Sequence, residues 1–173
     1  MTDEQLRILG YLTAQGAKLE PSEIVDKVRA AMDQLRSAVS AVPPTRFDER
    51  PQAEEWSANE VMAHVVTAGR FFGDAVIRLL DGLPGGGVRD RLERDAPRQS
   101  ADAWWALLER DRTALFERVG QADPQSRLDS TVEHPFFGPL NWRETLLFMR
   151  LHDLDHAGQL QKIAAVLNAP RPA

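Results

Sequence analysis

Hydrophobic residues recur at steps of three and four along four long segments of the chain, which is the spacing of an α-helix that buries one side. The segments lie at about residues 21–42, 57–80, 100–120 and 141–168. Polar and charged residues occupy the intervening positions, as expected for helices that expose their other face to water. We therefore predict an all-α protein built as a four-helix bundle.

Two of these segments begin with a capping signal. Ser57 is followed three residues later by Glu60, and Asn141 is followed in the same way by Glu144. In this arrangement each side chain accepts a hydrogen bond from a backbone amide that the first helical turn leaves without a partner. Glu60 also lies one turn before His64, which is a candidate metal ligand. The capping role explains Glu60, so we do not assign it as a further ligand.

Three other stretches are less regular. A short amphipathic piece around Leu6, Leu9 and Leu12 closes at Gly16, and we interpret it as a strap over one end of the bundle. Residues 82–99 contain consecutive glycines without the lysine of a phosphate loop.

We interpret residues 82–99 as a flexible connection, with a mobile lid as the alternative. Residues 128–140 alternate apolar and polar positions before a Pro-Phe-Phe-Gly-Pro run, which predicts a strand or small β-hairpin ahead of the last helix. The chain contains no internal repeat, so residues 1–173 are predicted to form one domain with its core at about 21–168.

Composition narrows the classes of partner. The chain is 43% hydrophobic and 27% charged, with a net charge of -5, so it has neither the basic field of a nucleic-acid-binding protein nor a membrane-spanning apolar run. The first residues lack the pattern of a signal peptide, and we expect a cytoplasmic protein. No cysteine is present, so any thiol chemistry requires an external thiol.

Three histidines are the candidate chemistry. His152 and His156 are four residues apart on the last helical segment, and His64 lies on the apolar face of the second. Residues four apart on a helix are stacked neighbours, so two imidazoles can converge on one ion while a packed helix supplies the third. The alternative is that each is a core histidine hydrogen-bonded to a neighbour.

A site with three neutral ligands leaves one coordination position open, which is typical of catalytic metal centres. Imidazole ligands without thiolate suit zinc, nickel or iron, with copper also compatible, and the sequence does not choose among these divalent ions. The open position could supply hydroxide from water or bind an incoming thiolate.

Three motifs together resemble the DinB-like superfamily, which includes the YfiT-like proteins, the bacillithiol transferases and the mycothiol-dependent maleylpyruvate isomerases. These motifs are residues 56–64, 134–140 and 152–159. The resemblance implies a four-helix bundle with a long crossover, often dimeric. It also implies a divalent metal held by one histidine of the second bundle helix and two of the fourth. The matching positions are His64, His152 and His156.

We accordingly predict a metal-dependent thiol (S-)transferase that acts with a low-molecular-weight thiol. One alternative is a metal-dependent hydrolase, in which a nearby carboxylate accepts a proton from water at the same open position. Asp153 and Asp155 are the nearest acids in sequence, and each could act as this base, support the ligands from outside or be solvated. Asp111 could face inward from the third helical segment, but we interpret it as a surface or capping residue. A second alternative is a non-enzymatic metal- or ligand-binding bundle of the stress-response kind.

Four other residues are given structural interpretations. Gln159 lies one turn after His156 and is a candidate to hydrogen-bond near the site, with solvent exposure as the alternative. His134 precedes a proline, and we assign it a turn or packing role. Trp105 and Phe116 indicate either the interface of a homodimer or burial within one subunit.

Overall fold

The protein is described from a computed structural model that covers residues 1–86 and 96–170. Its elements are the helices α1 (Asp3–Lys18), α2 (Pro21–Ser40), the short η1 (Pro44–Arg46), α3 (Ala58–Leu80), α4 (Ala101–Gly120) and α5 (Trp142–Asn168), and the strands β1 (Val132–His134) and β2 (Gly138–Leu140). The four predicted helices are thereby confirmed at nearly the predicted boundaries.

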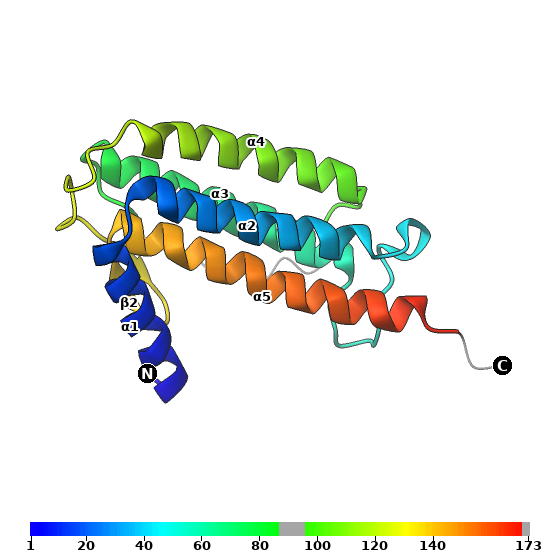
Figure 1. Ribbon diagram of the computed structural model, residues 1–173. Helices are drawn as coiled ribbons and strands as arrows, with labels where there is room; N and C mark the ends of the chain where they lie inside the picture. The colour runs from blue at the N-terminus through cyan, green and yellow to red at the C-terminus, as the bar shows by residue number, and fades with distance from the viewer. Residues whose placement is uncertain (87–95, 171–173) are drawn as a thin grey trace.

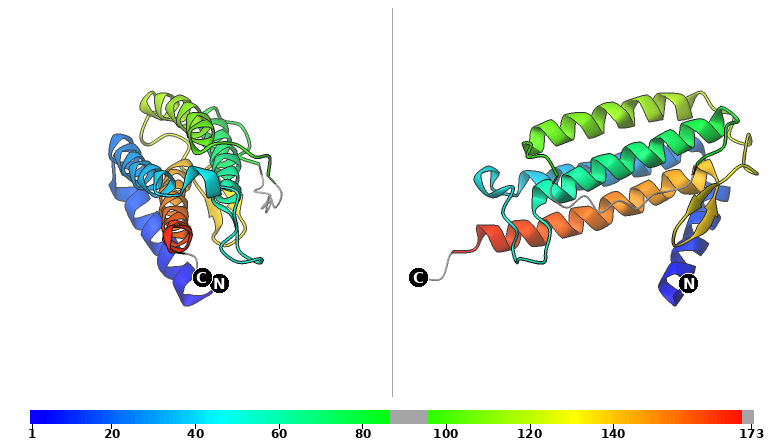
Figure 2. Two further views of the ribbon diagram at one scale, coloured as in Figure 1. Left: turned by 90° about the vertical axis from the view of Figure 1, so that its right-hand side faces the viewer. Right: turned by 180° about the vertical axis from the view of Figure 1, so that it is seen from behind.

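Helices α2, α3, α4 and α5 form the bundle. α5 packs on α2 and α3, and α4 packs on α3 and α2, so each of these four helices has two neighbours within the bundle. Figure 1 shows that α3 and α4 run in the same direction, opposite to α2 and α5, and Figure 2 shows the four helices end-on. The chain must therefore return along the bundle between α3 and α4, which confirms the four-helix bundle with a long crossover.

Both predicted capping boxes are present. The Ser57 hydroxyl accepts from the Glu60 amide at 3.2 Å, and the Glu60 carboxylate accepts from the Ser57 amide at 2.8 Å. Asn141 and Glu144 form the equivalent pair at the start of α5. Glu60 is also paired with the guanidinium of Arg50. These contacts fix where α3 and α5 begin, and they confirm that Glu60 serves the helix start.

Asn59 anchors the end of the crossover. Its side-chain oxygen accepts from the Trp104 indole at 2.7 Å and from the Gln99 amide at 3.2 Å, while its amide nitrogen donates to the carbonyl of Pro97 at 3.3 Å. Asn59 is buried. The first turn of α3 is thus tied to the entry of α4.

In the described part of the glycine-rich connection, Gly85 and Gly86 allow the chain to pack closely. A Cβ on Gly85 would lie 2.9 Å from the Cβ of Val132 and 3.1 Å from Leu79 Cδ2, and Gly86 has a φ of +80°. These glycines let the chain pass closely between the end of α3 and the hairpin. The remainder of the predicted flexible connection or lid, residues 87–95, lies outside the described residues.

Gly85→Ala is expected to lower the free energy of unfolding by about 1–3 kcal/mol, because the added methyl overlaps a buried valine and a carbonyl oxygen. Gly158→Ala is the matched control: nothing lies within 4 Å of a Cβ there, and alanine in a helix interior stabilises by about 0.5–1 kcal/mol. Urea unfolding of the two variants checks the opposite signs. Equal effects of the two substitutions would contradict this packing.

The N-terminal segment is longer than the predicted short piece. It forms the 16-residue helix α1, capped by Thr2, which packs against α5. Leu12 is buried as expected, but Leu6 is 53% exposed. The capping box at Thr2 and Gln5 extends the helix beyond its apolar positions, which explains why apolar spacing alone underestimated it.

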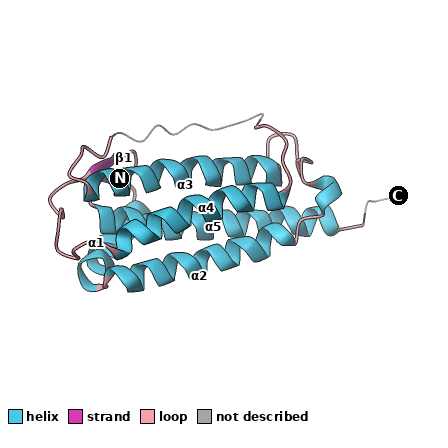
Figure 3. Cartoon of the chain, turned by 90° about the horizontal axis from the view of Figure 1, so that it is seen from above, coloured by secondary structure: helices cyan, strands magenta, loops and turns pink. Residues whose placement is uncertain are grey.

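The predicted β-hairpin is confirmed. β1 pairs antiparallel with β2, with His134 opposite Gly138 and Val132 opposite Leu140. Val132, His134 and Leu140 are buried. Figure 3 shows the hairpin at one end of the helical array. It therefore closes this end of the bundle just before α5.

Trp105 and Phe116 are buried within the subunit, at 8% and 6% exposure. Arg36 stacks on the Trp105 ring and Arg29 on the Phe116 ring. These two residues therefore give no support to a dimer interface. In the described part of the chain, no helix combines the length and the apolar character that a membrane crossing requires.

Candidate metal centre

Two bundle helices bring the three predicted histidines together. His64 lies in the first half of α3, and His152 and His156 are one turn apart near the middle of α5. One ring nitrogen from each lies within 4.8 Å of the others, and the Nε2 atoms of His64 and His152 are 3.1 Å apart. The packing of α3 on α5 thus creates the three-imidazole cluster that the sequence predicts.

Hydrogen bonding sets the orientation of His156. Its Nδ1 lies 2.9 Å from Gln159 Oε1. An amide oxygen only accepts hydrogen bonds, so Nδ1 carries the proton and Nε2 of the neutral ring carries a lone pair. Metal-binding histidines commonly have this outer partner, which fixes the tautomer. The predicted contact of Gln159 near the site is present.

The surroundings of His156 keep its imidazole neutral. Burial, followed by the nearby His152, lowers the pKa of His156 to about 4, against a raising effect of the hydrogen bond with Gln159. A neutral imidazole is the form that binds a metal. At neutral pH, His156 is therefore in the neutral form that can bind a metal.

The stability of the metal-free protein is expected to fall as the pH drops from 6.5 to 4. The unfolded chain protonates His156 near its ordinary pKa of 6.5, while the folded chain does so only near 4. The unfolded state therefore binds more protons in this interval, and about 3 kcal/mol is lost across it.

Urea unfolding between pH 4.5 and 7.5 measures this dependence, and the His156→Gln variant provides the reference because it cannot titrate. The difference between the two curves isolates the histidine from carboxylates that titrate in both proteins. Parallel curves would show that His156 does not carry the pH dependence.

The three imidazoles fit a divalent ion. Nitrogen ligands about 2.1 Å from a tetrahedral ion lie about 3.4 Å from one another, close to the 3.1 Å between the His64 and His152 nitrogens. The ring centroids of His152 and His156 are 4.4 Å apart, and those of His64 and His156 are 4.9 Å apart. The three rings are therefore close enough together to share one ion.

A buried ion pair joins α4 to α5 next to the histidine cluster. Arg112 Nη2 donates to both carboxylate oxygens of Asp153, at 2.9 and 3.0 Å, with the two side chains 2% and 0% exposed. One Asp153 oxygen is 3.9 Å from His152 Nδ1, too far for a hydrogen bond. Asp153 is thus held by arginine on α4 and is not solvated.

Arg112 was not among the predicted site residues, although its spacing carried a signal. It lies four residues after Leu108 and three before Leu115, on the apolar face of α4. A charge in that row must find a buried counter-charge. What sequence spacing could not give is the partner, because Asp153 belongs to a different helix.

Asp155 lies near enough to His156 to raise the pKa of that histidine, whereas Asp111 is paired with two arginines. Asp155 is exposed. Asp111 accepts hydrogen bonds from Arg70 and Arg110. Burial, which raises its pKa, is outweighed by these bonds, so the pKa of Asp111 lies below its ordinary value. The predicted surface role of Asp111 is confirmed.

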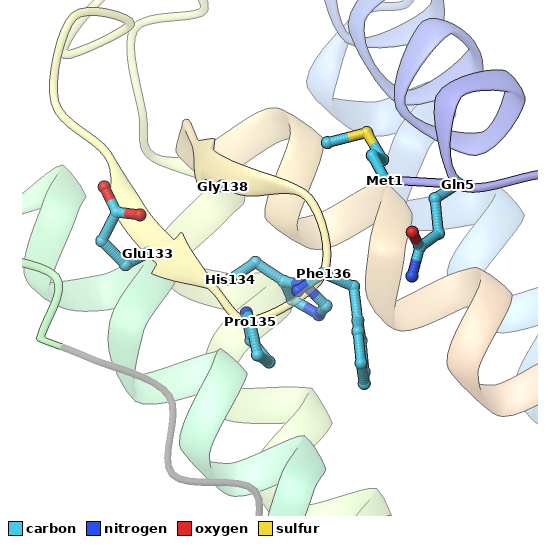
Figure 4. Close-up of a pocket in the computed structure, with 7 residues that line it drawn as sticks. All are labelled: Met1, Gln5, Glu133, His134, Pro135, Phe136 and Gly138. Atoms are coloured by element: carbon cyan, nitrogen blue, oxygen red, sulfur yellow. The ribbon is translucent and has the colours of Figure 1, made fainter. Parts of the chain in front are cut away.

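His134 has the predicted packing role. Its ring stacks on Phe137 at 4.8 Å and meets Phe148 edge-on at 4.3 Å, and its Nδ1 accepts from the Phe136 amide. It lines a cavity of about 570 Å³, and Figure 4 shows it on the hairpin, opposite Met1 and Gln5 of the N-terminal segment. Phe72 and Phe148 separate it from His152.

Fold and site together define a helical-bundle protein with a three-histidine candidate metal centre. The family model of the DinB superfamily matches residues 26–160. The chain belongs to this superfamily, which confirms the resemblance of its motifs.

A solved structure described as TT2238, a four-helix bundle protein, is similar to this chain. It shares 25% sequence identity with a TM-score of 0.64, over 82% of this chain and 98% of the other. This likeness agrees with the bundle fold. Comparison with curated proteins gives no match.

Proposed function

We propose that His64, His152 and His156 hold one divalent metal ion and that the protein is a metal-dependent thiol (S-)transferase acting with a low-molecular-weight thiol. The observation that carries the proposal is the convergence of three imidazoles from two helices, their ring nitrogens within 4.8 Å. Bound there, a divalent ion supplies Lewis-acid chemistry that lowers the pKa of a thiol in the open position, so that thiolate is present at neutral pH.

The chain's own residues prepare this position. Gln159 keeps the Nε2 lone pair of His156 available by accepting from Nδ1–H. Trp56 packs edge-on against His64, with ring centroids 5.3 Å apart, and limits the rotation of that ligand. Phe72 and Phe148 line the His152 side with apolar rings. An apolar wall favours a soft sulfur nucleophile and an electrophile with a carbon skeleton.

The placement of the acids favours thiol transfer over hydrolysis. A hydrolase of the predicted kind needs a carboxylate near the open position to accept a proton from water. Asp153 is occupied by Arg112, Asp155 is exposed, and Glu60 serves the capping box and Arg50. A thiol that ionises on binding releases its proton to solvent and needs no such base.

The proposed transfer balances without an oxidant or reductant. The thiol loses its proton, the sulfur electron pair forms a bond to an electrophilic carbon, and a leaving group departs from that carbon with its bonding pair. Because the chain has no cysteine, no thiol of the protein competes with the cosubstrate.

The test is turnover of thiol and electrophile pairs by metal-loaded protein. Cysteine, glutathione, bacillithiol and mycothiol are each assayed with 1-chloro-2,4-dinitrobenzene. The thiol sulfur displaces chloride, and the dinitrophenyl thioether that forms is followed by its absorbance. The proposal expects a rate about 100-fold or more above the uncatalysed reaction with at least one thiol. His152→Ala is expected to abolish it, while Asp155→Asn, an exposed change on the same helix, leaves it intact.

Other outcomes overturn the transferase proposal. Ester hydrolysis without thiol transfer would select the hydrolase. A metal-bound protein with neither activity, whose melting temperature falls sharply on chelation, would be a non-enzymatic bundle in which the ion stabilises the core.

A further inference from the structure

The outer edge of the His152 ring lies beside a buried carboxylate. Nε2 of His152 is 3.1 Å from Nε2 of His64, so this nitrogen faces the other imidazoles. Nδ1, on the other side of the ring, is 3.9 Å from an oxygen of Asp153. Among the described residues, Asp153 is the only acid with an oxygen within 4 Å of a His152 nitrogen. Its charge is therefore the one that acts most closely on Nδ1.

Contacts from two other helices fix this carboxylate in place. Asp153 is fully buried, and both of its oxygens accept hydrogen bonds from Nη2 of Arg112 on α4, at 2.9 and 3.0 Å. Gly69 of α3 leaves room for the guanidinium, because a Cβ there would lie 3.5 Å from Nη2. The interior thus holds a negative group at one position beside His152.

A fixed carboxylate discriminates between the two neutral forms of the His152 ring. With the proton on Nδ1, the positive end of an N–H bond faces Asp153, whereas with the proton on Nε2 a lone pair faces it. The first arrangement is attractive and the second repulsive. Screening by water is weak, since the Asp153 side chain is 0% exposed. The carboxylate therefore favours the form in which Nε2 carries the lone pair.

We propose that Asp153 is a positioning residue of the metal centre, which selects the Nδ1–H form of His152 and so directs the Nε2 lone pair into the cluster. The inference rests on the proposed three-histidine centre. It gives His152 a charged outer partner, as Gln159 is the neutral outer partner of His156. Asp153 acts through His152 alone and does not contact the thiol or the electrophile.

The same selection fixes the proton between two imidazoles of the metal-free protein. The 3.1 Å contact between the Nε2 atoms of His64 and His152 needs one donor and one acceptor. Because His152 Nε2 carries a lone pair, the proton belongs to His64 Nε2. The two rings are therefore in opposite neutral forms, and His64 is the ligand whose Nε2 must lose a proton before it can bind an ion.

Long-range ¹H–¹⁵N NMR of the imidazole rings tests this arrangement, because a ring nitrogen with a proton and one with a lone pair give well-separated signals. The metal-free full chain is measured at a pH at which the rings are neutral, and His64→Gln and His152→Gln assign the signals. We expect the Nδ1–H form of His152 to exceed the other form about tenfold, with His64 in the Nε2–H form. An equal mixture at His152, or an excess of its Nε2–H form, would overturn the proposal.

A double variant attributes the selection to Asp153. Asp153→Leu with Arg112→Met removes the carboxylate without leaving the arginine unpaired, and a dispersed NMR spectrum shows that the variant is folded. We expect the His152 ring to shift towards the Nε2–H form and the zinc affinity to fall about 10–100-fold. Gln159→Leu is the matched control, which should alter the form of His156 and leave that of His152 unchanged.

Asp153→Asn is the second variant, because it keeps the shape of the side chain and removes its charge. It should lower the excess of the Nδ1–H form in the same direction. If His152 keeps its tenfold excess without the carboxylate, Asp153 does not select the ring form and the proposal is wrong. The ring forms are measured in metal-free protein, whereas the proposed function fails on zinc binding and turnover, so the two failures are distinguishable.

Discussion

Replacing Asp153 by leucine is expected to lower the free energy of unfolding of the metal-free protein by about 3–5 kcal/mol, because Arg112 is left as an uncompensated charge in the interior. The two side chains are 2% and 0% exposed, and both carboxylate oxygens accept from one guanidinium nitrogen. Few single substitutions in a domain of this size have so large an effect.

The double variant Asp153→Leu with Arg112→Met separates loss of the pair from loss of packing. Replacing both charges by apolar side chains removes the uncompensated arginine, so the double variant should recover much of the stability lost by Asp153→Leu. Asp155→Leu, two residues away and exposed, is the control and should stay within about 0.5 kcal/mol of the wild type. Urea unfolding measures all four proteins.

A small effect of Asp153→Leu alone would contradict a buried, paired carboxylate at this position. The same would follow if the double variant were as unstable as the single one. Either result would show that the Arg112–Asp153 pair does not stabilise the contact between α4 and α5.

The second large effect concerns the metal. His152→Ala is expected to lower the affinity for zinc by more than the roughly 100-fold that loss of an outer hydrogen-bond partner costs, because two imidazoles remain where three converge. Competition with a chromophoric chelator measures the affinity. Gln159→Leu, which keeps all three ligands but removes the acceptor for His156 Nδ1, should lose about 10–100-fold.

The relative zinc affinities of the wild type and these two variants identify the ligands. Equal affinities for wild type and His152→Ala would place the ion elsewhere in the protein. A larger loss for Gln159→Leu than for His152→Ala would mean that the glutamine itself, and not the histidine, is the ligand.

Much of the fold could be predicted because its signals are local. Apolar residues at helical spacing gave the four bundle helices, and the Ser57–Glu60 and Asn141–Glu144 pairs marked where two of them begin. The histidine cluster could be predicted for a related reason: each histidine lies on the buried face of its helix, and buried faces of a bundle meet. The motif resemblance then supplied the bundle fold and its long crossover.

The features that were missed depend on contacts between distant segments. No local pattern pairs Arg112 with Asp153, or joins Asn59 to the indole of Trp104. Trp105 and Phe116 could be assigned to the interior only once α2 was packed against α4 and its arginines covered their rings. The full extent of α1 was missed because polar residues cap and extend it beyond its apolar positions.

X-ray absorption spectroscopy, combined with the metal content of protein purified without an affinity tag or chelator, tests the central claim most directly. The three-histidine centre predicts about one divalent ion per chain with three imidazole nitrogens at about 2 Å, and loss of the ion in both His64→Ala and His156→Ala. A folded wild type that retains no metal and rejects added zinc, nickel and iron would contradict the claim and leave three core histidines held by one another and by Gln159.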